Sequence, residues 1–346
     1  MTDVKIGLCG LGSIGKAAAR LLIDHRSGID VVAAITKDPA DIGRPLGEVA
    51  ASSAPHDLVV GEDLDALLAT RPDLVLFATG SFLARTTDDI VKVAAAGADL
   101  ISPCEELAFP FTRDAEAARR IDQAARTAGA TVLGTGVNPG FMFDSFLAAA
   151  SGCSWDVAGV TGRRVVDVAG FGQNIHRRLG IGYTAEEFEA GHADGTIAGH
   201  VGFPESVALI AERFGWTLDG PVVETFEPMV ARTDAPSNYG GVPAGRTEGF
   251  VQRAVGTVEG RPMVRLELIL HLRPAAEGLA AEDTFSIGGV HPVQVTISPG
   301  MDAIPATAAQ LVNSIPAVLG AAPGLRTVND LPAAAAWTQL EAVVRR

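Results

Sequence analysis

The feature that most constrains this chain is a glycine pattern near its N-terminus. The apolar segment Val4 to Cys9 is followed by Gly10, Gly12 and Gly15 in the spacing G-x-G-x-x-G, and then by the alanine-rich segment Lys16 to Leu22. This succession predicts a strand, a tight turn and a helix. In such a unit the first glycine permits the turn, the second lets the backbone approach a pyrophosphate, and the third lets helix and strand pack closely.

The N-terminus of the predicted helix is the expected phosphate site, because unpaired N–H groups and the helix dipole favour an anion there. The expected cofactor contacts in this loop are Gly10, Gly12, Ser13, Ile14 and Gly15. A bare glycine pattern also occurs in plain loops. Its position here, between a strand and a helix, favours the dinucleotide site.

Length and charge narrow the class of protein. A chain of 346 residues is long enough for two domains with real cores. The net charge of −14 and the absence of a basic run argue against binding to nucleic acid or to an anionic membrane surface. No signal-peptide pattern and no apolar stretch of membrane-spanning length occur. We therefore expect a cytoplasmic protein that acts on small molecules.

The pattern of predicted elements divides the chain. Residues 1–139 alternate strands and helices, which is typical of a Rossmann domain, a doubly wound parallel sheet covered on both faces. Residues 140–302 predict an α+β domain for substrate binding and dimerisation, built on a largely antiparallel sheet. Its strands are expected at Val157 to Val168, Val222 to Ala231, Phe250 to Val258 and Met263 to Leu272.

The open face of that second sheet needs a cover, and a second subunit would supply it, so we expect a homodimer. Residues 303–346 predict helices at 303–319 and 332–344 that pack back on the first domain.

Two further loops are expected to touch the cofactor. The second predicted strand ends at Thr36 and Lys37, where dinucleotide folds usually carry the acid that binds the ribose 2′-hydroxyl. Neither residue repels a 2′-phosphate, so NADP is tolerated or preferred. Thr79, Gly80 and Ser81 follow a buried strand, where the reactive end of the cofactor tends to lie; Ser81 would serve equally as a plain helix cap.

Glu105 and Glu106 are the candidate catalytic residues. They follow a predicted strand at the carboxyl edge of the sheet, beside the loop expected to hold the nicotinamide. A carboxylate there can hold ammonium by a charge-assisted hydrogen bond and shuttle protons. A solvated helix start, favoured by the dipole, is the competing interpretation of the same pair.

The second domain offers several polar candidates for a substrate pocket. Arg164, Asn174 and His176 lie in polar islands that would line a pocket or form solvated loops, and His200 lies in a glycine-flanked turn that favours a structural role. No HExxH or paired metal-ligand spacing occurs among the histidines, so no metal site is expected.

Several motifs together resemble the 2,4-diaminopentanoate dehydrogenases and the related native amine dehydrogenases, whose N-terminal half is similar to dihydrodipicolinate reductase. These motifs are the glycine loop, Ser102 to Pro110 with its Cys-Glu-Glu-Leu, Gly134 to Phe141 with its Val-Asn-Pro-Gly, Gly199 to Ser206 and Gly324 to Pro332.

The resemblance implies an NAD(P)-dependent amine dehydrogenase, which deaminates an amine oxidatively or aminates a ketone or aldehyde with ammonia. It implies that one of Glu105 and Glu106 is catalytic, without saying which. It also implies that the substrate pocket is bordered by Asn138, Phe141 and His200. Asn138 would contact the cofactor as well.

The segment Val165 to Val168 is apolar around one acid, so it offers few partners for a second charged amine. A small, mostly apolar ketone or aldehyde is therefore favoured over 2,4-diaminopentanoate. Two alternatives stay open: a reductase of a preformed imine or carbonyl that uses no free ammonia, and a non-catalytic NAD(P)-binding sensor.

Overall fold

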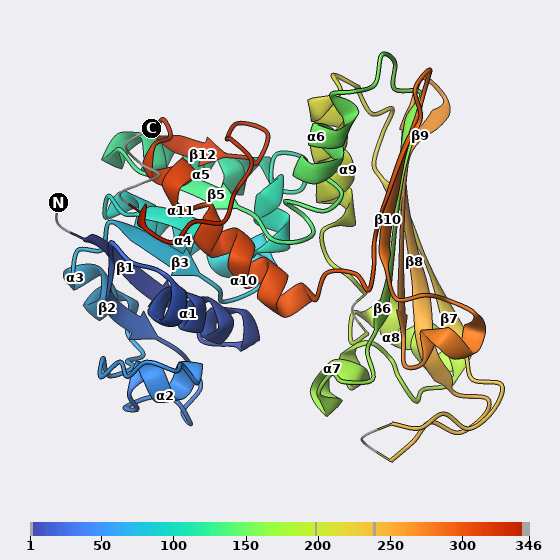
Figure 1. Ribbon diagram of the computed structural model, residues 1–346, viewed down its shortest axis with the longest axis horizontal. Coiled ribbons are helices and arrows are strands. Elements are labelled where there is room, and N and C mark those ends of the chain that lie inside the picture. Colours follow the sequence, from blue (N-terminus) through green and yellow to red (C-terminus); the bar gives the residue numbers. More distant parts are fainter. Residues whose placement is uncertain (1–2, 198, 238–239, 341–346) are drawn as a thin grey trace. The chain divides into compact units, whose positions relative to one another are not determined.

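A computed structural model describes residues 3–197, 199–237 and 240–340, without the side chain of Asn174. The chain forms two compact units, one made of Met1–Phe146 with Asp302–Arg346 and the other of Leu147–Met301. Each unit is built around its own sheet (Figure 1). No helix among the described residues is both long enough and apolar enough to span a membrane.

The first unit contains a six-stranded sheet in the order β12-β5-β4-β3-β1-β2, in which every pair of neighbours is parallel. The strands are β1 Val4–Cys9, β2 Ile29–Ile35, β3 Leu74–Phe77, β4 Asp99–Ser102, β5 Thr131–Gly134 and β12 Gly324–Arg326. Their buried, apolar sequences are those of strands covered on both faces.

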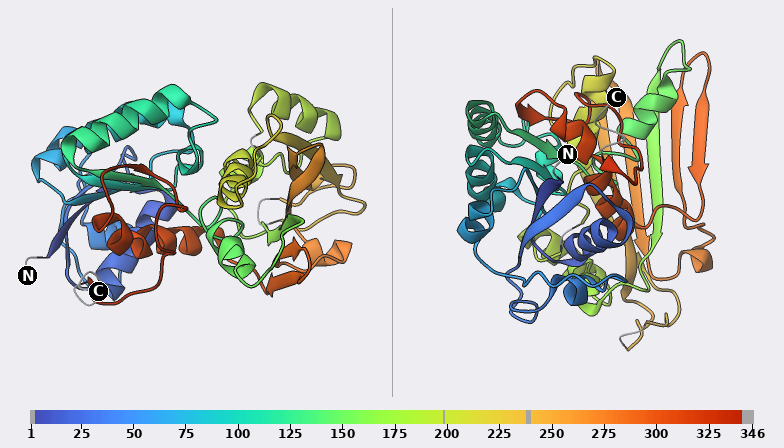
Figure 2. Two further views of the ribbon diagram at one scale, coloured as in Figure 1. Left: turned by 90° about the horizontal axis from the view of Figure 1, so that it is seen from above. Right: turned by 60° about the vertical axis from the view of Figure 1, so that its left-hand side comes forward.

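Helices cover both faces of this sheet, as Figure 2 shows from above. One core packs under α1 Ser13–His25, α2 Leu46–Ala50, α10 Ala303–Asn313 and α11 Ile315–Leu319. The other packs under α3 Leu64–Ala69, α4 Leu83–Ala95 and α5 Ala115–Ala128. The predicted Rossmann architecture is confirmed.

The C-terminal segment differs from the sequence prediction. Residues 303–319 form two helices, α10 and α11, separated at Ser314, and residues 324–326 add the edge strand β12. Residues 332–339 are not helical, and 341–346 lie outside the described residues. The buried indole of Trp337 donates a hydrogen bond to Val312 O at 3.1 Å, and Arg26 lies over its ring. This anchoring outweighs the helix propensity of the alanine run Ala333 to Ala336.

The second unit contains a six-stranded sheet in the order β11-β10-β6-β9-β8-β7. Its strands are β6 Gly159–Asp167, β7 Val223–Val230, β8 Thr247–Val258, β9 Arg261–His271, β10 Asp283–Gly288 and β11 Val293–Ile297. All neighbours are antiparallel except β6 and β9, so the predicted, largely antiparallel sheet is confirmed.

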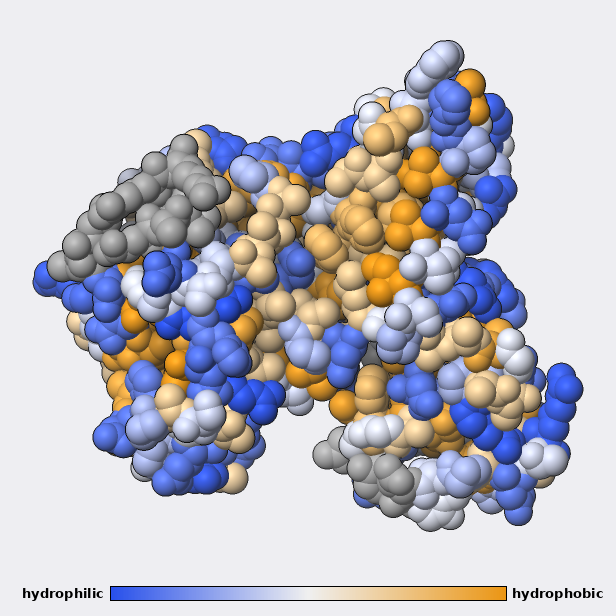
Figure 3. All heavy atoms as spheres, viewed as in Figure 1, coloured by the Kyte–Doolittle hydropathy of each residue, from blue (hydrophilic) through white to orange (hydrophobic). Residues whose placement is uncertain are grey.

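The helices of this unit are α6 Ser145–Ser151, α7 Gln173–Arg178, α8 Ala185–Asp194 and α9 Phe203–Arg213, and it also contains the short 3-10 turn η2 Pro274–Glu277. The first unit contains the 3-10 turn η1 Glu105–Ala108. The helix α9 packs on β8 and β9 with a nearly continuous run of buried residues. In the space-filling view apolar residues gather over α6, which carries the run Phe146 to Ala150 (Figure 3).

Candidate active site

The parallel sheet has a topological switch point between β1 and β3. The chain leaves β1 for β2 on one side, and β3 lies on the other side of β1. In open α/β sheets ligands bind outside the carboxyl ends of the strands at such a point. The glycine loop follows β1 and the loop Thr79 to Ser81 follows β3, so the two predicted cofactor loops are neighbours here.

Close packing explains two of the three glycines. Gly10 has a φ of +93°, and a Cβ there would lie 2.4 Å from Ala78 O. A Cβ on Gly15 would lie 1.9 Å from Gly10 O. A side chain at either position therefore collides with backbone that cannot move cheaply.

Gly12 is different, because a Cβ there would meet no protein atom within 4 Å. It is the N-cap of α1, and no side chain caps that helix. Ser13, Ile14 and Gly15 form the first turn, whose N–H groups lack intrahelical partners. An open space beside uncapped helix amides is the environment that a pyrophosphate needs, so the loop fits a dinucleotide.

The loop after β2 presents the second pair of predicted cofactor residues. Thr36 is buried, and its Oγ1 accepts a hydrogen bond from Asp38 N at 3.2 Å, whereas Lys37 is exposed. Behind this loop Lys16 Nζ of α1 lies 2.6 Å from Asp41 Oδ2. The acid nearest the end of β2 in the chain, Asp38, caps the next turn through Ala40 N.

Glu106 is tied to the loop that follows β3. Its Oε2 accepts a hydrogen bond at 2.7 Å from the N–H of Leu83, the first residue of α4, and its own N–H donates to Ser81 O at 3.4 Å. Its Oε1 lies 3.6 Å from Arg113 Nε. One carboxylate oxygen of Glu106 thus holds the start of α4, and the other faces Arg113.

Glu105 is the other member of the pair and begins the same 3-10 turn, directly after β4. Its side chain is half-buried. Because β4 lies between β3 and β5, Glu105 belongs to the edge that carries Thr79 to Ser81 on one side and the loop after β5 on the other.

That loop after β5 carries Asn138 and Phe141. Asn138 is buried, and Phe141 is half-buried with its ring stacked on Phe146 at a centroid distance of 5.7 Å. The N–H of Thr135 donates to Ser102 O at 2.9 Å, which joins the ends of β4 and β5. Residues predicted from four separate motifs therefore meet at one edge of the first unit.

In the second unit Arg164 and His200 lie near each other. Arg164 is buried, its Nε donates to Asp283 Oδ1 at 2.9 Å, and one terminal nitrogen donates to Met301 O at 2.8 Å. Loss of hydration, followed by the positive charge of Arg164, lowers the pKa of His200 to about 3. The imidazole of His200 is therefore neutral at pH 7.

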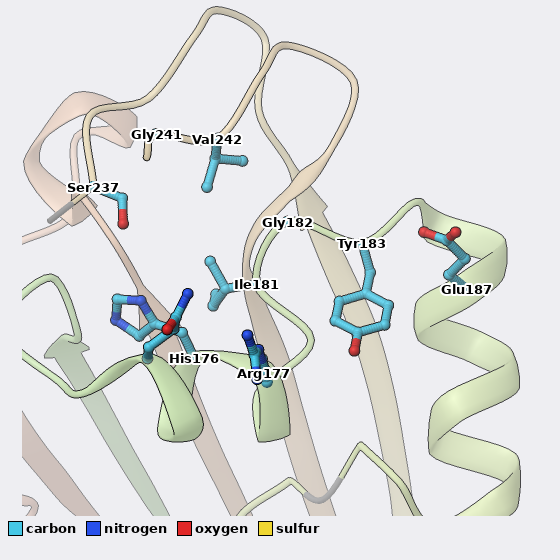
Figure 4. A pocket seen from close by; sticks show the side chains of 10 residues that line it. His176, Arg177, Ile181, Gly182, Tyr183, Glu187, Ser237, Gly241 and Val242 are labelled. Atoms are coloured by element: carbon cyan, nitrogen blue, oxygen red, sulfur yellow. The ribbon is translucent and has the colours of Figure 1, made fainter. Parts of the chain in front are cut away.

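His176 lies apart from that pair, in a cavity of about 320 Å³ at the end of the sheet (Figure 4). Its Nε2 donates to Val168 O at 2.7 Å. Tyr183 of the same cavity contacts Thr247 at the start of β8, whereas His200 contacts Gln252. Thr247 and Gln252 are five residues apart on β8, which corresponds to about 17 Å along a strand, so this cavity is separate from the surroundings of His200. Asn174 belongs to α7, the helix that also carries His176, and the structure does not describe its side chain.

Sequence reasoning missed two residues of these sites. Arg113 approaches Glu106 from beyond the 3-10 turn, and no local pattern marks it. Gln252 is fully buried on β8 and holds the backbone of His200. The signal that would have found Gln252 is a lone amide between the apolar residues Phe250 and Ala254 at alternate positions of one strand. Among the described residues no cluster of three or more His, Cys, Asp or Glu side chains could hold a metal ion.

Comparison with known proteins gives consistent matches. The model of the 2,4-diaminopentanoate dehydrogenase C-terminal domain matches residues 141–345. A 2,4-diaminopentanoate dehydrogenase of Acetoanaerobium sticklandii is 34% identical over 96% of this chain and 94% of its own length. An amine dehydrogenase of Streptomyces virginiae is 24% identical over 93% of this chain and 94% of its own.

Among solved structures, an amine dehydrogenase from Mycobacterium smegmatis has a TM-score of 0.85 at 23% identity and covers 97% of this chain and 98% of its own. A scyllo-inositol dehydrogenase from Lactobacillus casei, solved with NAD(H) and scyllo-inositol, has a TM-score of 0.54 at 17% identity over 90% of this chain and 89% of its own. Both structural likenesses, at 23% and 17% identity, concern the fold alone. The family resemblance that the motifs indicate is confirmed.

Proposed function

Because the chain belongs to the 2,4-diaminopentanoate dehydrogenase family, and is thus an oxidoreductase acting on CH-NH2 donors, we propose that it is an NAD(P)-dependent amine dehydrogenase. It deaminates a small amine oxidatively, or aminates a ketone or aldehyde with ammonia in the reverse direction. The observation that carries the proposal is the position of Glu105 and Glu106 in the 3-10 turn that follows β4, where Glu106 is hydrogen-bonded to Ser81 and Leu83 after β3.

The cofactor is NAD or NADP, held by the glycine loop and the uncapped start of α1. Gly12 supports this position with its open space, and Ser13 to Gly15 with their amides. Bound NAD(P)H supplies the hydride that reduces the substrate carbon. Thr36 and Lys37 carry no negative charge toward a 2′-phosphate, which supports tolerance of NADP or preference for it.

Glu105 is the acid/base residue in this proposal and Glu106 the residue that positions the neighbouring loop. Glu106 already accepts from Leu83 N and lies beside Arg113, so its carboxylate keeps α4 and residues 79–82 in place. Glu105 holds ammonium by a charge-assisted hydrogen bond. It takes one proton from the ammonium, so that neutral ammonia can add to the carbonyl carbon. It then gives that proton to the hydroxyl of the carbinolamine, which leaves as water when the C=N bond forms.

The substrate class is a small, mostly apolar ketone or aldehyde and the corresponding amine. The proposed substrate-binding residues are Asn138 and Phe141 of the first unit and Arg164 and His200 of the second. Asn174 and His176 of the second unit are retained as further candidates. The carboxylate of Asp283 is already paired with Arg164, and His200 is neutral, so neither offers a negative charge to a second ammonium group. A buried ammonium without such a partner is costly, which disfavours a diamine.

Single replacements of the two glutamates test the mechanism. Glu105→Gln removes the titrating group, so kcat/KM for reductive amination should fall about 10²- to 10⁴-fold. Glu106→Gln keeps an oxygen for Leu83 N–H and loses only the charge that faces the half-exposed Arg113 at 3.6 Å, so the loss should stay below about tenfold. The measurement is NADPH and NADH consumption with a carbonyl panel and ammonium, beside cofactor binding by fluorescence. Near-normal turnover in both variants with intact cofactor binding contradicts the mechanism.

The same assay separates the alternatives. A reductase of a preformed imine or carbonyl would turn over a ketone or a cyclic imine at a rate independent of ammonium concentration. A non-catalytic sensor would bind NAD(P)H without any change in nicotinamide absorbance across the panel. The non-catalytic sensor has no use for a carboxylate pair at this edge of the sheet.

A homodimer completes the proposal. One face of the second sheet carries an apolar cluster made of Val165, Val251 and Ile269. Arg163 and Glu267 lie on the same face, two residues before Val165 and Ile269 along their strands. A second copy of the chain would cover such a sheet face. Light scattering coupled to size-exclusion chromatography should give about twice the chain mass of 35.7 kDa. A mass of one chain contradicts this part.

A further inference from the structure

One row of residues crosses the second sheet beneath His200. In this row Asp283 pairs with Arg164, Arg164 with Leu268, Leu268 with Gln252, and Gln252 with Phe226. Paired residues of adjacent strands project to the same face. Arg164 and Gln252 are therefore polar side chains of one inner row, and both are buried.

Gln252 uses both ends of its amide to hold His200. Its Oε1 accepts from His200 N at 2.7 Å, and its Nε2 donates to His200 O at 2.8 Å. The same Nε2 donates to Glu224 Oε1 at 3.0 Å, which fixes the direction in which the amide points. A two-point contact of this kind sets both the position and the orientation of the His200 peptide.

The residue before His200 allows this contact. A Cβ on Gly199 would lie 2.1 Å from Cε1 of Phe226 and 2.7 Å from Oε1 of Gln252. Only a glycine lets the backbone approach the row this closely. On the other side, the ring of His200 meets the ring of Phe203 edge to face at a centroid distance of 5.1 Å. The turn is therefore held from below by β8 and followed directly by α9.

We infer that Gln252 is a positioning residue for the substrate pocket, which holds the His200 imidazole in place by clamping its backbone. The inference rests on the proposed function for the role of His200, since a pocket residue is what Gln252 would position. Gln252 itself acts only through His200.

The central variant is Gln252→Met, which keeps the length of the side chain and removes both hydrogen bonds. Misplacing a pocket group by an ångström can cost about 10²-fold, so kcat/KM for the carbonyl should fall roughly 10- to 100-fold while NAD(P)H affinity stays within about twofold. In the His200→Ala background the same replacement should cost no more than about twofold, because the group it positions is gone. Equal losses in both backgrounds overturn the inference.

A matched control separates positioning from general destabilisation. Val264→Ala truncates a fully buried side chain on β9, paired with Val160 and Gly256 and away from the turn. It should lower Tm yet leave kcat/KM close to that of the wild type. If Val264→Ala reproduces the kinetic loss of Gln252→Met at equal Tm, the role of Gln252 is only structural. Should Gln252→Met fail to fold, Gly199→Ala, which disturbs the same contact, should give the kinetic pattern expected of Gln252→Met.

Histidine-ring NMR provides a readout that does not depend on activity. In the wild type the His200 ring should stay neutral from about pH 8 to about pH 5, because its pKa is lowered to about 3. In Gln252→Met the displaced ring should gain water and titrate within that range, with His200→Gln assigning the signal. An unchanged titration overturns the inference. Absence of ammonium-dependent turnover in the wild type would instead refute the proposed function, and the NMR result would still judge Gln252.

Discussion

The two glycines at the start of α1 make opposite predictions for the same small change. A methyl group on Gly15 would lie 1.9 Å from Gly10 O, whereas a methyl group on Gly12 would meet no protein atom within 4 Å. Favourable separations of heavy atoms are about 3.5–4.0 Å. Gly15→Ala therefore requires a backbone shift of well over an ångström, and Gly12→Ala requires none.

We expect Gly15→Ala to reduce the free energy of unfolding by about 3 kcal/mol, the upper part of the range for overpacking. For a unit of this size that lowers Tm by roughly 6–12 °C. Gly12→Ala loses only the small advantage of glycine over alanine at an N-cap, about 1 kcal/mol or less. Its methyl group instead occupies the space proposed for the pyrophosphate, so NADPH affinity should weaken roughly 10- to 100-fold.

Differential scanning fluorimetry without cofactor and fluorescence titration with NADPH measure the two quantities on the same samples. If Gly12→Ala binds NADPH as tightly as the wild type, the open space at Gly12 is not the phosphate site. If Gly15→Ala is as stable as the wild type, the close contact with Gly10 is absent.

Two further predictions concern charges of the first unit. Replacing Thr36 with Asp should lower NADPH affinity relative to NADH by about tenfold, through repulsion of the 2′-phosphate; an unchanged ratio of the two dissociation constants removes Thr36 from the cofactor site. Burial raises the pKa of Asp99 from 3.8 to about 6, against the hydrogen bond from Thr131 N. The stability that this shift contributes is complete below about pH 4 and is lost as pH rises through 6. Asp99→Asn should therefore be more stable than the wild type by about 1–2 kcal/mol at pH 8. Thermal melts should show this advantage at pH 8 and no advantage near pH 4.

The position of the candidate site followed from the sequence because it depends on local patterns and on one topological rule. Glycine spacing marks the loop after β1, and strand-length apolar runs mark the ends of β3 and β4. Parallel strands end at a common edge, so motifs that are far apart in the chain are brought together without knowledge of side-chain contacts. The order β5-β4-β3-β1 then makes Glu105 a neighbour of the loops on both sides.

The proposed division of roles between Glu105 and Glu106 could not be predicted in this way. It depends on the hydrogen bond from Leu83 N to Glu106, between residues 23 positions apart. The polar residues of the second unit show the same limit. Arg164 pairs with Asp283, which is 119 positions away, and this pairing distinguishes a buried, ion-paired cation from an exposed loop residue. Patterns of local spacing contain no information about such partners.

The buried amide of Gln252 shows what kind of sequence signal does carry information about tertiary contacts. An apolar strand that faces a core has no local reason to contain an amide at an inward position, because an unpaired amide there is costly. Such a residue must therefore have a partner, and the backbone of a turn is a partner that any sequence provides. In this chain the turn is Gly199-His200, and the glycine is needed because Phe226 and Gln252 lie too close for a side chain. A buried amide on a strand, together with a glycine beside a candidate histidine elsewhere in the chain, is thus a testable predictor of a clamped site residue.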